Sequence, residues 1–454
     1  MLRLHDTAAG AVLPLELREP GRAAIYVCGP TVYDEPHVGH GRFCLVWDIL
    51  RRYLEWSGLA VRFVSNVTDI DDRIIDRAAE EDRPTTEVTE RYEAAWYRCM
   101  DALGVRRPDH DPHATAYVDP MVELIADLEA AGVAYPTGHG VYLSVERVDG
   151  YGLLARQPLD SLRAGARVEV EEGKRGPLDF VLWKGAKPGE PSWDSPWGRG
   201  RPGWHTECVV MALDLLGEDF DLHGGGVDLA FPHHENERAQ AAVLGRRFAR
   251  RWVHSGHVVV GGGEKMSKSL GNVRSLAALL DEVGDPRAYR LLVLQSHYRS
   301  PLEVSPHTLG QARRGLAGLD NLSRRAAEAG IAGGAPDPDA LARFRSAMDD
   351  DLDTPAATGL VFDLARRANA ALDAGDREGA APLVAAIVEV WAAVGLALAS
   401  GPAQLDEETV ALVRRRDQAR AARDWSAADS LRDELVGRGL VVEDTPEGTR
   451  VHRA

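Results

Sequence analysis

Apolar and polar positions near the start of the chain predict a strand, a helix and a second strand. Residues 23–28 (AAIYVC) form a short apolar run that a Gly-Pro pair stops, as expected for a buried strand. Apolar side chains then recur at helical spacing over 39–57, and a second apolar run follows at 60–66. Because ligands of parallel sheets lie beyond the carboxyl ends of the strands, we expect a site near Cys28 and 66–72.

Further along the chain, the pattern indicates an insertion and then a change of fold class. Between 134 and 190, short strands are separated by glycine, proline and charged residues, which is typical of an inserted module. Helical patterns at 204–216 and 232–246 flank a glycine-rich stretch at 224–226, which predicts a turn. From about residue 303 the periodicity is almost entirely helical, until the chain ends in a predicted hairpin.

Composition and charge narrow the class of protein. The chain has 454 residues, of which 44% are hydrophobic, so more than one globular domain is expected at about 100–200 residues each. No apolar run approaches the roughly 18 residues that cross a bilayer, and the amino terminus does not resemble a signal peptide. Four cysteines are too few for a disulfide framework. We therefore expect a cytoplasmic protein with no membrane association.

The formal net charge of −17 argues against a protein that coats nucleic acid without specificity, because phosphate contacts need lysine and arginine. It leaves room for one confined basic face. Locally basic stretches such as 413–423 (VRRRDQARAAR) fit such a face, but they are equally typical of a solvated helix.

Residues 36–40 (PHVGH) precede the first long predicted helix and form a candidate phosphate site. A helix amino terminus offers unpaired N–H groups and positive partial charge. His37 and His40 can hydrogen-bond phosphate oxygens, and Gly39 permits close approach of a nucleotide. The alternative is a pair of surface histidines beside a turn glycine, and the motif alone does not decide between them.

The second candidate phosphate element is 265–269 (KMSKS), which follows a run of three glycines. Its two lysines can neutralise charge that develops on a triphosphate, although a basic surface loop is the alternative. Together the two elements resemble the HIGH and KMSKS signatures of class I aminoacyl-tRNA synthetases, with Val38 in place of isoleucine. The resemblance implies that ATP binds with Mg²⁺ at His37, Gly39, His40, Lys265, Ser267 and Lys268. The catalytic residues among them would be His37, His40, Lys265 and Lys268.

Candidate metal ligands lie between and before these two elements. His233 and Glu237 are four residues apart, so on a helix they share one face. With Cys28 and Cys208 they could hold Zn²⁺, for which thiolate and imidazole are strong ligands. The spacing leaves two alternatives open, because a lone cysteine is usually a small core residue and His234 could replace His233.

Longer stretches resemble the cysteinyl-tRNA synthetase family from the first residues to the last. They include YVCGPTVYDEPHVGH (26–40), NVTDIDD (66–72), RPGWHTEC (201–208), FPHHENE (231–237) and EKMSKSLGN (264–272). The resemblance implies one zinc per chain, bound by Cys28, Cys208, His233 and Glu237, that takes the cysteine substrate as a thiolate. It also implies a pocket walled by Trp204, with the amino and carboxylate groups held by Thr31, Thr68 and His223. For each of these four pocket residues, a packing or capping role is the alternative.

The family resemblance implies the following fold, function and partners. The fold would be α/β: a Rossmann-like parallel-sheet catalytic domain with an insertion, an α-helical bundle and a small α+β domain. The expected parts are two Rossmann halves (1–117 and 196–260), the insertion between them (118–195), a KMSKS-loop and stem-contact region (261–302), an anticodon-binding bundle (303–398) and a small C-terminal domain (399–454). A monomer would activate L-cysteine with ATP and transfer it to the 3′ end of cysteine tRNA.

Two other functions fit parts of the same pattern. A cysteine ligase of the mycothiol pathway resembles the catalytic half and joins cysteine to an amino sugar, but it lacks a full anticodon-binding tail. A non-catalytic tRNA-binding paralogue should have lost signature residues, whereas both signatures are present in this chain.

Overall fold

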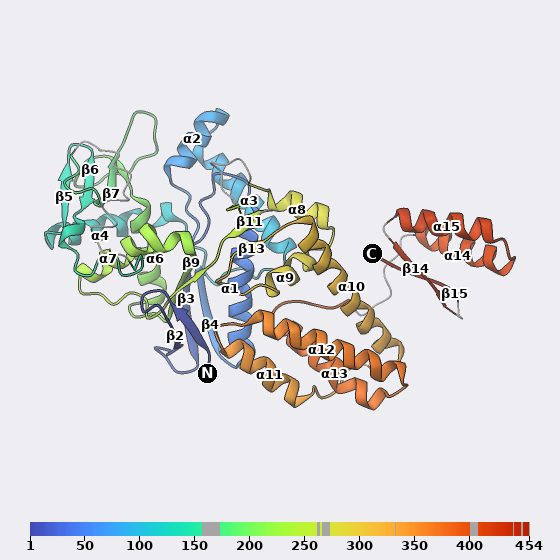
Figure 1. Cartoon of the computed structure of the whole chain (residues 1–454). Coiled ribbons are helices and arrows are strands. Elements are labelled where there is room, and N and C mark those ends of the chain that lie inside the picture. The colour runs from blue at the N-terminus through green and yellow to red at the C-terminus, as the bar shows by residue number, and fades with distance from the viewer. Residues whose placement is uncertain are drawn as a thin grey trace. The chain divides into compact units, whose positions relative to one another are not determined.

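The computed structural model describes residues 1–156, 173–260, 264–265, 273–331, 333–399, 407–438, 440–445 and 448–453 (Figure 1). The chain divides into two compact units. The first comprises Met1–Ser305 with Arg345–Ala357 and Ala393–Gly395, and the second comprises the remaining helical and C-terminal segments. Among the described residues, no helix is long and apolar enough to cross a membrane.

A parallel four-stranded sheet forms the centre of the first unit. Its strands run in the order β10 (Trp252–Ser255), β9 (Leu222–Gly226), β3 (Arg22–Val27) and β4 (Ala60–Ser65). Helix α1 (Val38–Trp56) connects β3 to β4, which confirms the strand, helix and strand predicted from the apolar pattern. The carboxyl ends of all four strands therefore lie at one edge of the sheet.

The glycine run at 224–226 lies in strand β9 and does not form a turn, so that prediction was wrong. The Trp47 ring of α1 lies against Gly224, where a Cβ atom would come within 2.3 Å of the ring. The ring of His234 lies against Gly225 in the same way, at 2.5 Å. Glycine usually interrupts strands, but here it lets two aromatic rings pack directly onto the backbone of a central strand.

Other elements of the first unit cover and extend this sheet. Helix α6 (Trp204–Leu216) leads into β9, and α7 (Glu235–Val243) leads into β10. A separate antiparallel sheet in the order β5-β6-β7-β8 takes its first three strands from 118–195, the region expected to be an insertion, whereas β8 lies beyond that region. The remaining elements are β1 (Arg3–Asp6), β2 (Ala11–Pro14), α2 (Asp72–Glu81), α3 (Thr85–Ala102), α4 (Val118–Ala130), β5 (Ala134–Thr137), β6 (Gly140–Leu143), β7 (Phe180–Gly185), β8 (Gly200–Pro202), β11 (Val258–Val260), β12 (Glu264–Lys265), α8 (Leu276–Val283), α9 (Pro286–Leu294) and β13 (Leu302–Glu303).

The part of the chain after residue 305 is mainly helical. Its elements are α10 (Pro306–Glu328), α11 (Pro338–Asp349), α12 (Thr354–Asp373), α13 (Arg377–Ala393), α14 (Glu407–Ala421), α15 (Trp425–Gly437), β14 (Leu440–Thr445) and β15 (Gly448–Arg453). Strands β14 and β15 pair as the predicted antiparallel hairpin. The buried Arg416 of α14 donates to Asp444 at 2.7 Å and to Thr449 at 2.5 Å, which fixes this helix to the hairpin.

Candidate active site

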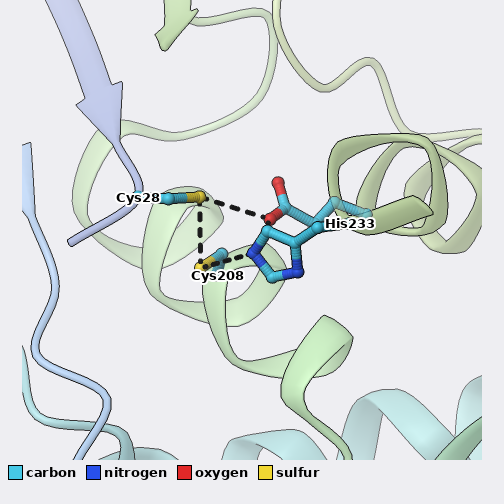
Figure 2. Close-up of side chains that lie close together, drawn as sticks. Cys28, Cys208 and His233 are labelled. Atoms are coloured by element: carbon cyan, nitrogen blue, oxygen red, sulfur yellow. Dashed lines mark hydrogen bonds and ion pairs between the residues drawn. The ribbon is translucent and has the colours of Figure 1, made fainter. Parts of the chain in front are cut away.

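Two thiols, an imidazole and a carboxylate meet at the carboxyl edge of the central sheet (Figure 2). The Cys28 Sγ lies 3.6 Å from the Cys208 Sγ and 3.4 Å from the Glu237 Oε1. The His233 Nε2 lies 3.8 Å from the Cys208 Sγ and 2.8 Å from the Glu237 Oε1. One ligand atom from each of the four residues lies within 4.8 Å of all the others, so the structure brings the predicted metal ligands together.

Different elements deliver these four side chains. Cys28 directly follows the last residue of β3, and Cys208 lies in the second turn of α6. His233 precedes α7, and Glu237 lies in the first turn of that helix. The imidazole and the carboxylate are therefore one helical turn apart. Burial is nearly complete, since none of the four exceeds 4% exposure. The cluster is therefore part of the core and is held by the sheet and two helices.

Charge in the cluster is distributed unevenly. Burial, with Cys208 and Glu237, raises the pKa of the Cys28 thiol well above its usual value. Burial also disfavours the Cys208 thiolate, but the hydrogen bond from Cys28 and the neighbouring His233 lower the pKa of Cys208 to about 6. Against the effect of burial, Glu237 raises the pKa of His233 to about 10. The site therefore concentrates negative charge on Cys208 and Glu237, as a cation site requires.

The donor set fits a tetrahedral zinc ion. In such a site, two sulfur ligands at about 2.3 Å from the metal lie about 3.8 Å from each other, close to the 3.6 Å between Cys28 and Cys208. The 2.8 Å between His233 and Glu237 is shorter than the roughly 3.3 Å expected for nitrogen and oxygen ligands, so this pair would separate slightly around an ion. Thiolate and imidazole favour zinc over magnesium or calcium.

A second set of donors shares two of these residues. Cys28, His223, His234 and Glu237 also place one ligand atom each within 4.8 Å of one another. His233 lines the cavity described below, whereas His234 and His223 do not. Of the first set, Cys28, Cys208 and His233 line the cavity, whereas only Cys28 of the second set does, so a ligand in the cavity faces the first set. This favours His233 over His234, the alternative that the sequence left open.

The His233 ring is held in the orientation that a metal ligand needs. It stacks on Trp204 with a centroid distance of 3.8 Å and an interplanar angle of 13°. Its Nδ1 lies 3.0 Å from the Nδ1 of His205. Burial and His233 lower the pKa of His205 to about 3, so His205 is neutral and can accept a hydrogen bond from His233. The His233 Nε2 is then the atom that faces the thiols.

A cavity of about 590 Å³ adjoins the cluster and reaches the start of α1. Among the predicted site residues, its lining includes Cys28, Thr31, His37, Gly39, His40, Thr68, Trp204, Cys208 and His233. The thiol cluster and the first phosphate motif therefore open into one space. Glu237 and His223 lie behind the lining, where the His223 Nε2 hydrogen-bonds to the Glu237 Oε2 and the His223 Nδ1 lies 3.2 Å from the Tyr26 carbonyl oxygen.

The two histidines of the first motif form a reciprocal cap at the start of α1. The backbone N–H of His40 donates to the His37 Nδ1, and that of His37 donates to the His40 Nδ1, both at 3.2 Å. Their rings stack with centroids 3.5 Å apart. Because each Nδ1 accepts, each ring carries its proton on Nε2, which makes the Nε2–H a donor suited to a phosphate oxygen.

The second phosphate motif lies largely outside the described residues. Lys265 belongs to β12, where its backbone pairs with Val259, and its side chain is outside the described part of the chain. Ser267 and Lys268 are wholly outside it. The expected roles of all three residues therefore remain predictions.

Several cavity residues were not singled out from the sequence. Asn66, Arg73, Trp96, Asp228 and the stretch 255–258 also line the cavity. The Asn66 Nδ2 donates to the Thr68 Oγ1 at 3.2 Å, and the Thr68 Oγ1 donates to the buried Glu207 at 2.9 Å. Asn66 lies within 66–72, the stretch that its position after a buried strand had marked, whereas nothing local marks Trp96 or Asp228.

Three parts of the chain match known families. Residues 14–314 match the family described as the tRNA synthetases class I (C) catalytic domain. Residues 343–399 match the DALR domain, and residues 403–451 match the cysteinyl-tRNA ligase anticodon binding domain.

Similar proteins span the whole chain. The cysteine–tRNA ligase of Halorhodospira halophila is 48% identical over 464 residues, which cover 100% of both chains. That of Alkalilimnicola ehrlichii is 46% identical over 465 residues, again with full coverage of both. The ligase of Geobacter sulfurreducens is 43% identical over 476 residues, which cover 99% of this chain and 98% of the relative.

Solved structures with the same fold are more distant in sequence. Methionyl-tRNA synthetase of Mycobacterium tuberculosis in complex with methionyl-adenylate gives a TM-score of 0.61 at 16% identity, covering 90% of this chain and 96% of its own. A putative arginyl-tRNA synthetase from Campylobacter jejuni gives 0.58 at 13% identity, covering 85% of this chain and 94% of its own. These likenesses concern the fold alone, and they confirm the predicted fold class.

Proposed function

The chain belongs to the cysteine–tRNA ligase family of class I tRNA synthetases, and we propose that it activates L-cysteine with ATP and transfers it to the 3′ end of cysteine tRNA. One observation carries the proposal: a single cavity is lined both by the thiol cluster and by the phosphate motif at the start of α1. A substrate bound to the cluster by its thiol can therefore present its carboxylate to a nucleotide in the same space.

In the first step, the carboxylate of cysteine attacks the α-phosphate of ATP, forming cysteinyl-adenylate and releasing pyrophosphate. The Nε2–H groups of His37 and His40 donate to phosphate oxygens, and the helix amino terminus favours negative charge there. Lys265 and Lys268 neutralise the charge that grows on the departing pyrophosphate, and bound Mg²⁺ would supply further positive charge there. Gly39 has no side chain, so the nucleotide can approach the backbone closely.

The Cys28, Cys208, His233 and Glu237 side chains would hold one zinc ion, and the substrate thiol would bind from the cavity side, either as a fifth ligand or in place of Glu237. Zinc prefers a soft thiolate to a neutral hydroxyl, which separates cysteine from serine where shape alone would not. Trp204 keeps the His233 ring in place and walls the pocket. Thr31 and Thr68 line the same cavity and would bind the amino and carboxylate groups of the substrate. His223 lies behind the lining and would act through its hydrogen bond to the Glu237 carboxylate.

Transfer requires a tRNA that reaches both the cavity and the anticodon-reading part of the chain. The C-terminal domain matches the family's anticodon binding domain over residues 403–451. Within it, Trp425 at the start of α15 is 60% exposed, which is unusual for a tryptophan in a globular domain. An exposed indole ring is suited to stacking on an unpaired base, so we assign Trp425 to the anticodon contact.

Cysteine-dependent exchange of pyrophosphate into ATP, followed by charging of unfractionated tRNA, tests this function. We expect exchange with cysteine, at least about a hundredfold less with serine, and stable charging of tRNA. Exchange without charging, together with AMP release that depends on an amino sugar, would support the mycothiol-pathway ligase. Absence of exchange altogether would support the non-catalytic paralogue. The match of residues 403–451 to an anticodon binding domain favours the synthetase over the mycothiol-pathway ligase. The match of residues 14–314 to the catalytic domain, with both signatures present, favours it over the non-catalytic paralogue.

A further inference from the structure

Arg42 lies two residues after the phosphate motif and is almost completely buried, at 1% exposure. Its Nη1 donates to the carbonyl oxygen of His257 at 2.7 Å. Its Nη2 donates to the carbonyl oxygens of His297 at 3.3 Å and Tyr298 at 3.2 Å, and also to that of Ser300. One guanidinium group thus joins α1 to two segments that are more than two hundred residues away in sequence.

A buried cation with only carbonyl partners is costly to maintain. Burial lowers the pKa of Arg42 to about 10, so the group remains charged at neutral pH. Among the described residues, no carboxylate forms an ion pair with it, although buried arginines are usually paired with one. A planar guanidinium can donate hydrogen bonds to several acceptors at fixed angles, which the compact ammonium of lysine cannot do. The position therefore requires the fork geometry and not charge alone.

The segments that meet at Arg42 also contact each other tightly. The His257 carbonyl oxygen accepts a second hydrogen bond from the Leu302 N–H at 3.0 Å. The Gly256 N–H donates to the Tyr298 carbonyl oxygen at 2.8 Å. A Cβ atom on Gly256 would come within 2.5 Å of the Arg299 carbonyl oxygen, so only glycine permits this approach. The segments 256–257 and 298–302 therefore form a fixed junction, and Arg42 joins it to α1 by donating hydrogen bonds to both segments.

This junction lies behind two walls of the cavity. His37, Gly39 and His40 form one group of lining residues, called here the His37–His40 wall, and Gly256, His257 and Val258 form a second, called the 256–258 wall. On its opposite side, the start of α1 is fixed to the chain at 274–276, because the Val38 N–H donates to the Arg274 carbonyl oxygen and the Leu276 N–H to that of Pro36. The described residues that flank 261–272 on both sides are therefore attached to the same helix end.

We propose that Arg42 is a positioning residue for adenylate formation, which sets the separation between the His37–His40 wall and the 256–258 wall of the nucleotide cavity. It touches no substrate and acts through the carbonyl oxygens that it holds. The inference goes beyond the proposed function and rests on it. The thiol cluster lies at the end of β3, in α6, and just before and within α7, and among the described residues no hydrogen bond joins it to Arg42. Metal and cysteine binding should therefore be independent of this residue.

Arg42→Lys keeps the charge but cannot bind both segments with one planar group. We expect kcat for cysteine-dependent pyrophosphate exchange to fall about ten- to a hundredfold, with a smaller rise in the KM for ATP, because misplaced groups lose transition-state contacts first. Bound metal and the dissociation constant for cysteine should stay within about twofold of the unsubstituted protein. A residue with a merely structural role would reduce metal, cysteine binding and exchange together.

Arg51→Lys is the matched control. Arg51 is also a buried arginine of α1, but it donates to the Arg107 carbonyl oxygen, Asp109 and Glu55, none of which lines the nucleotide cavity. Its variant should keep kcat even if its melting temperature falls. Equal losses of kcat in both variants, or unchanged kcat in Arg42→Lys, would overturn the proposal.

Rates are normalised to the folded fraction of each sample, measured by circular dichroism, so that bound metal stays an independent readout. Arg42→Gln serves as a second variant, since an uncharged amide can reach only one of the two segments, and its kcat should fall as well. If neither Arg42 variant folds while Arg51→Lys does, Arg42 has a general structural role and the proposal fails. Absence of exchange in the unsubstituted protein would instead refute the proposed function, so the two failures are distinguishable.

Discussion

The thiol end and the nucleotide end of the cavity are built in different ways. Cys28, Cys208, His233 and Glu237 are buried side chains on a strand, two helices and the turn before one of them, and charge compensation within the cluster is strong. The nucleotide end consists of a helix amino terminus whose histidines are partly exposed, joined by Arg42 to a neighbouring backbone segment. On the proposed function, the thiol end would recognise its ligand by chemical identity, and the nucleotide end would recognise charge that develops during the reaction.

The largest expected effect is at the thiol end. Cys208→Ser removes a soft ligand and leaves a buried hydroxyl, so bound zinc should fall to less than about a tenth per chain, and cysteine binding should be lost with it. Metal analysis and calorimetry of cysteine binding measure the two quantities. Cys99→Ser is the control, because Cys99 is also buried but lies on α3 outside the cluster. Full zinc content in Cys208→Ser would refute the ligand assignment.

A second substitution tests the nucleotide end alone. Lys268→Ala should reduce adenylate formation about a hundredfold while cysteine affinity stays near that of the unsubstituted protein, as expected for a contact made in the transition state. Single-turnover measurements of adenylate formation, beside equilibrium binding of cysteine, separate these effects. Lys187→Ala removes an exposed lysine from the insertion and should change neither. Equal losses of rate and affinity would place Lys268 outside the transition-state contacts.

Trp204→Ala should have an intermediate effect, and it should separate metal retention from cysteine binding. The indole ring stacks on His233 but carries no ligand atom, so metal should be retained while the KM for cysteine rises about tenfold. Trp204→Phe should recover most of the loss, because a phenyl ring can still stack on the imidazole. If metal is lost together with affinity, the ring supports the whole cluster and not the substrate pocket.

The smallest expected effect comes from Val38→Ile, which restores the residue usual in the first signature. Val38 is 1% exposed, so an extra methylene must be accommodated in the core, at a cost of up to about 1 kcal/mol of stability. Exchange activity should stay within about twofold, because the side chain points away from the phosphate donors His37 and His40 and into the core. A tenfold change in rate would mean that packing under the helix end controls the reaction.

The sequence predicted the local elements well and the long-range contacts poorly. The strand, helix and strand around α1 follow from apolar periodicity, and Cys28 and Cys208 could be proposed from residue type and family resemblance. Spacing could not choose between His233 and His234, because adjacent residues differ only in which side of the cluster they face. The strand at Gly224 was missed because the reason for glycine there is the Trp47 ring, which lies far away in the sequence. Arg42 and Asp228 were also missed because their surroundings come from distant parts of the sequence. Arg42 binds carbonyl oxygens more than two hundred residues away, and Asp228 lines a cavity shared with residues of the first helix.

The reciprocal cap of His37 and His40 has a consequence for how variants at these positions combine. Each backbone N–H depends on the other residue's ring, so replacing either histidine leaves one N–H at the start of α1 without that acceptor. The remaining ring still accepts from the backbone N–H of the substituted residue, but it loses the ring on which it stacks. The two substitutions are therefore not independent events. Either change alone removes the stacking contact that the two rings share, so losing both should cost less than the sum of the two single losses. Part of the selective value of each histidine therefore depends on the presence of the other.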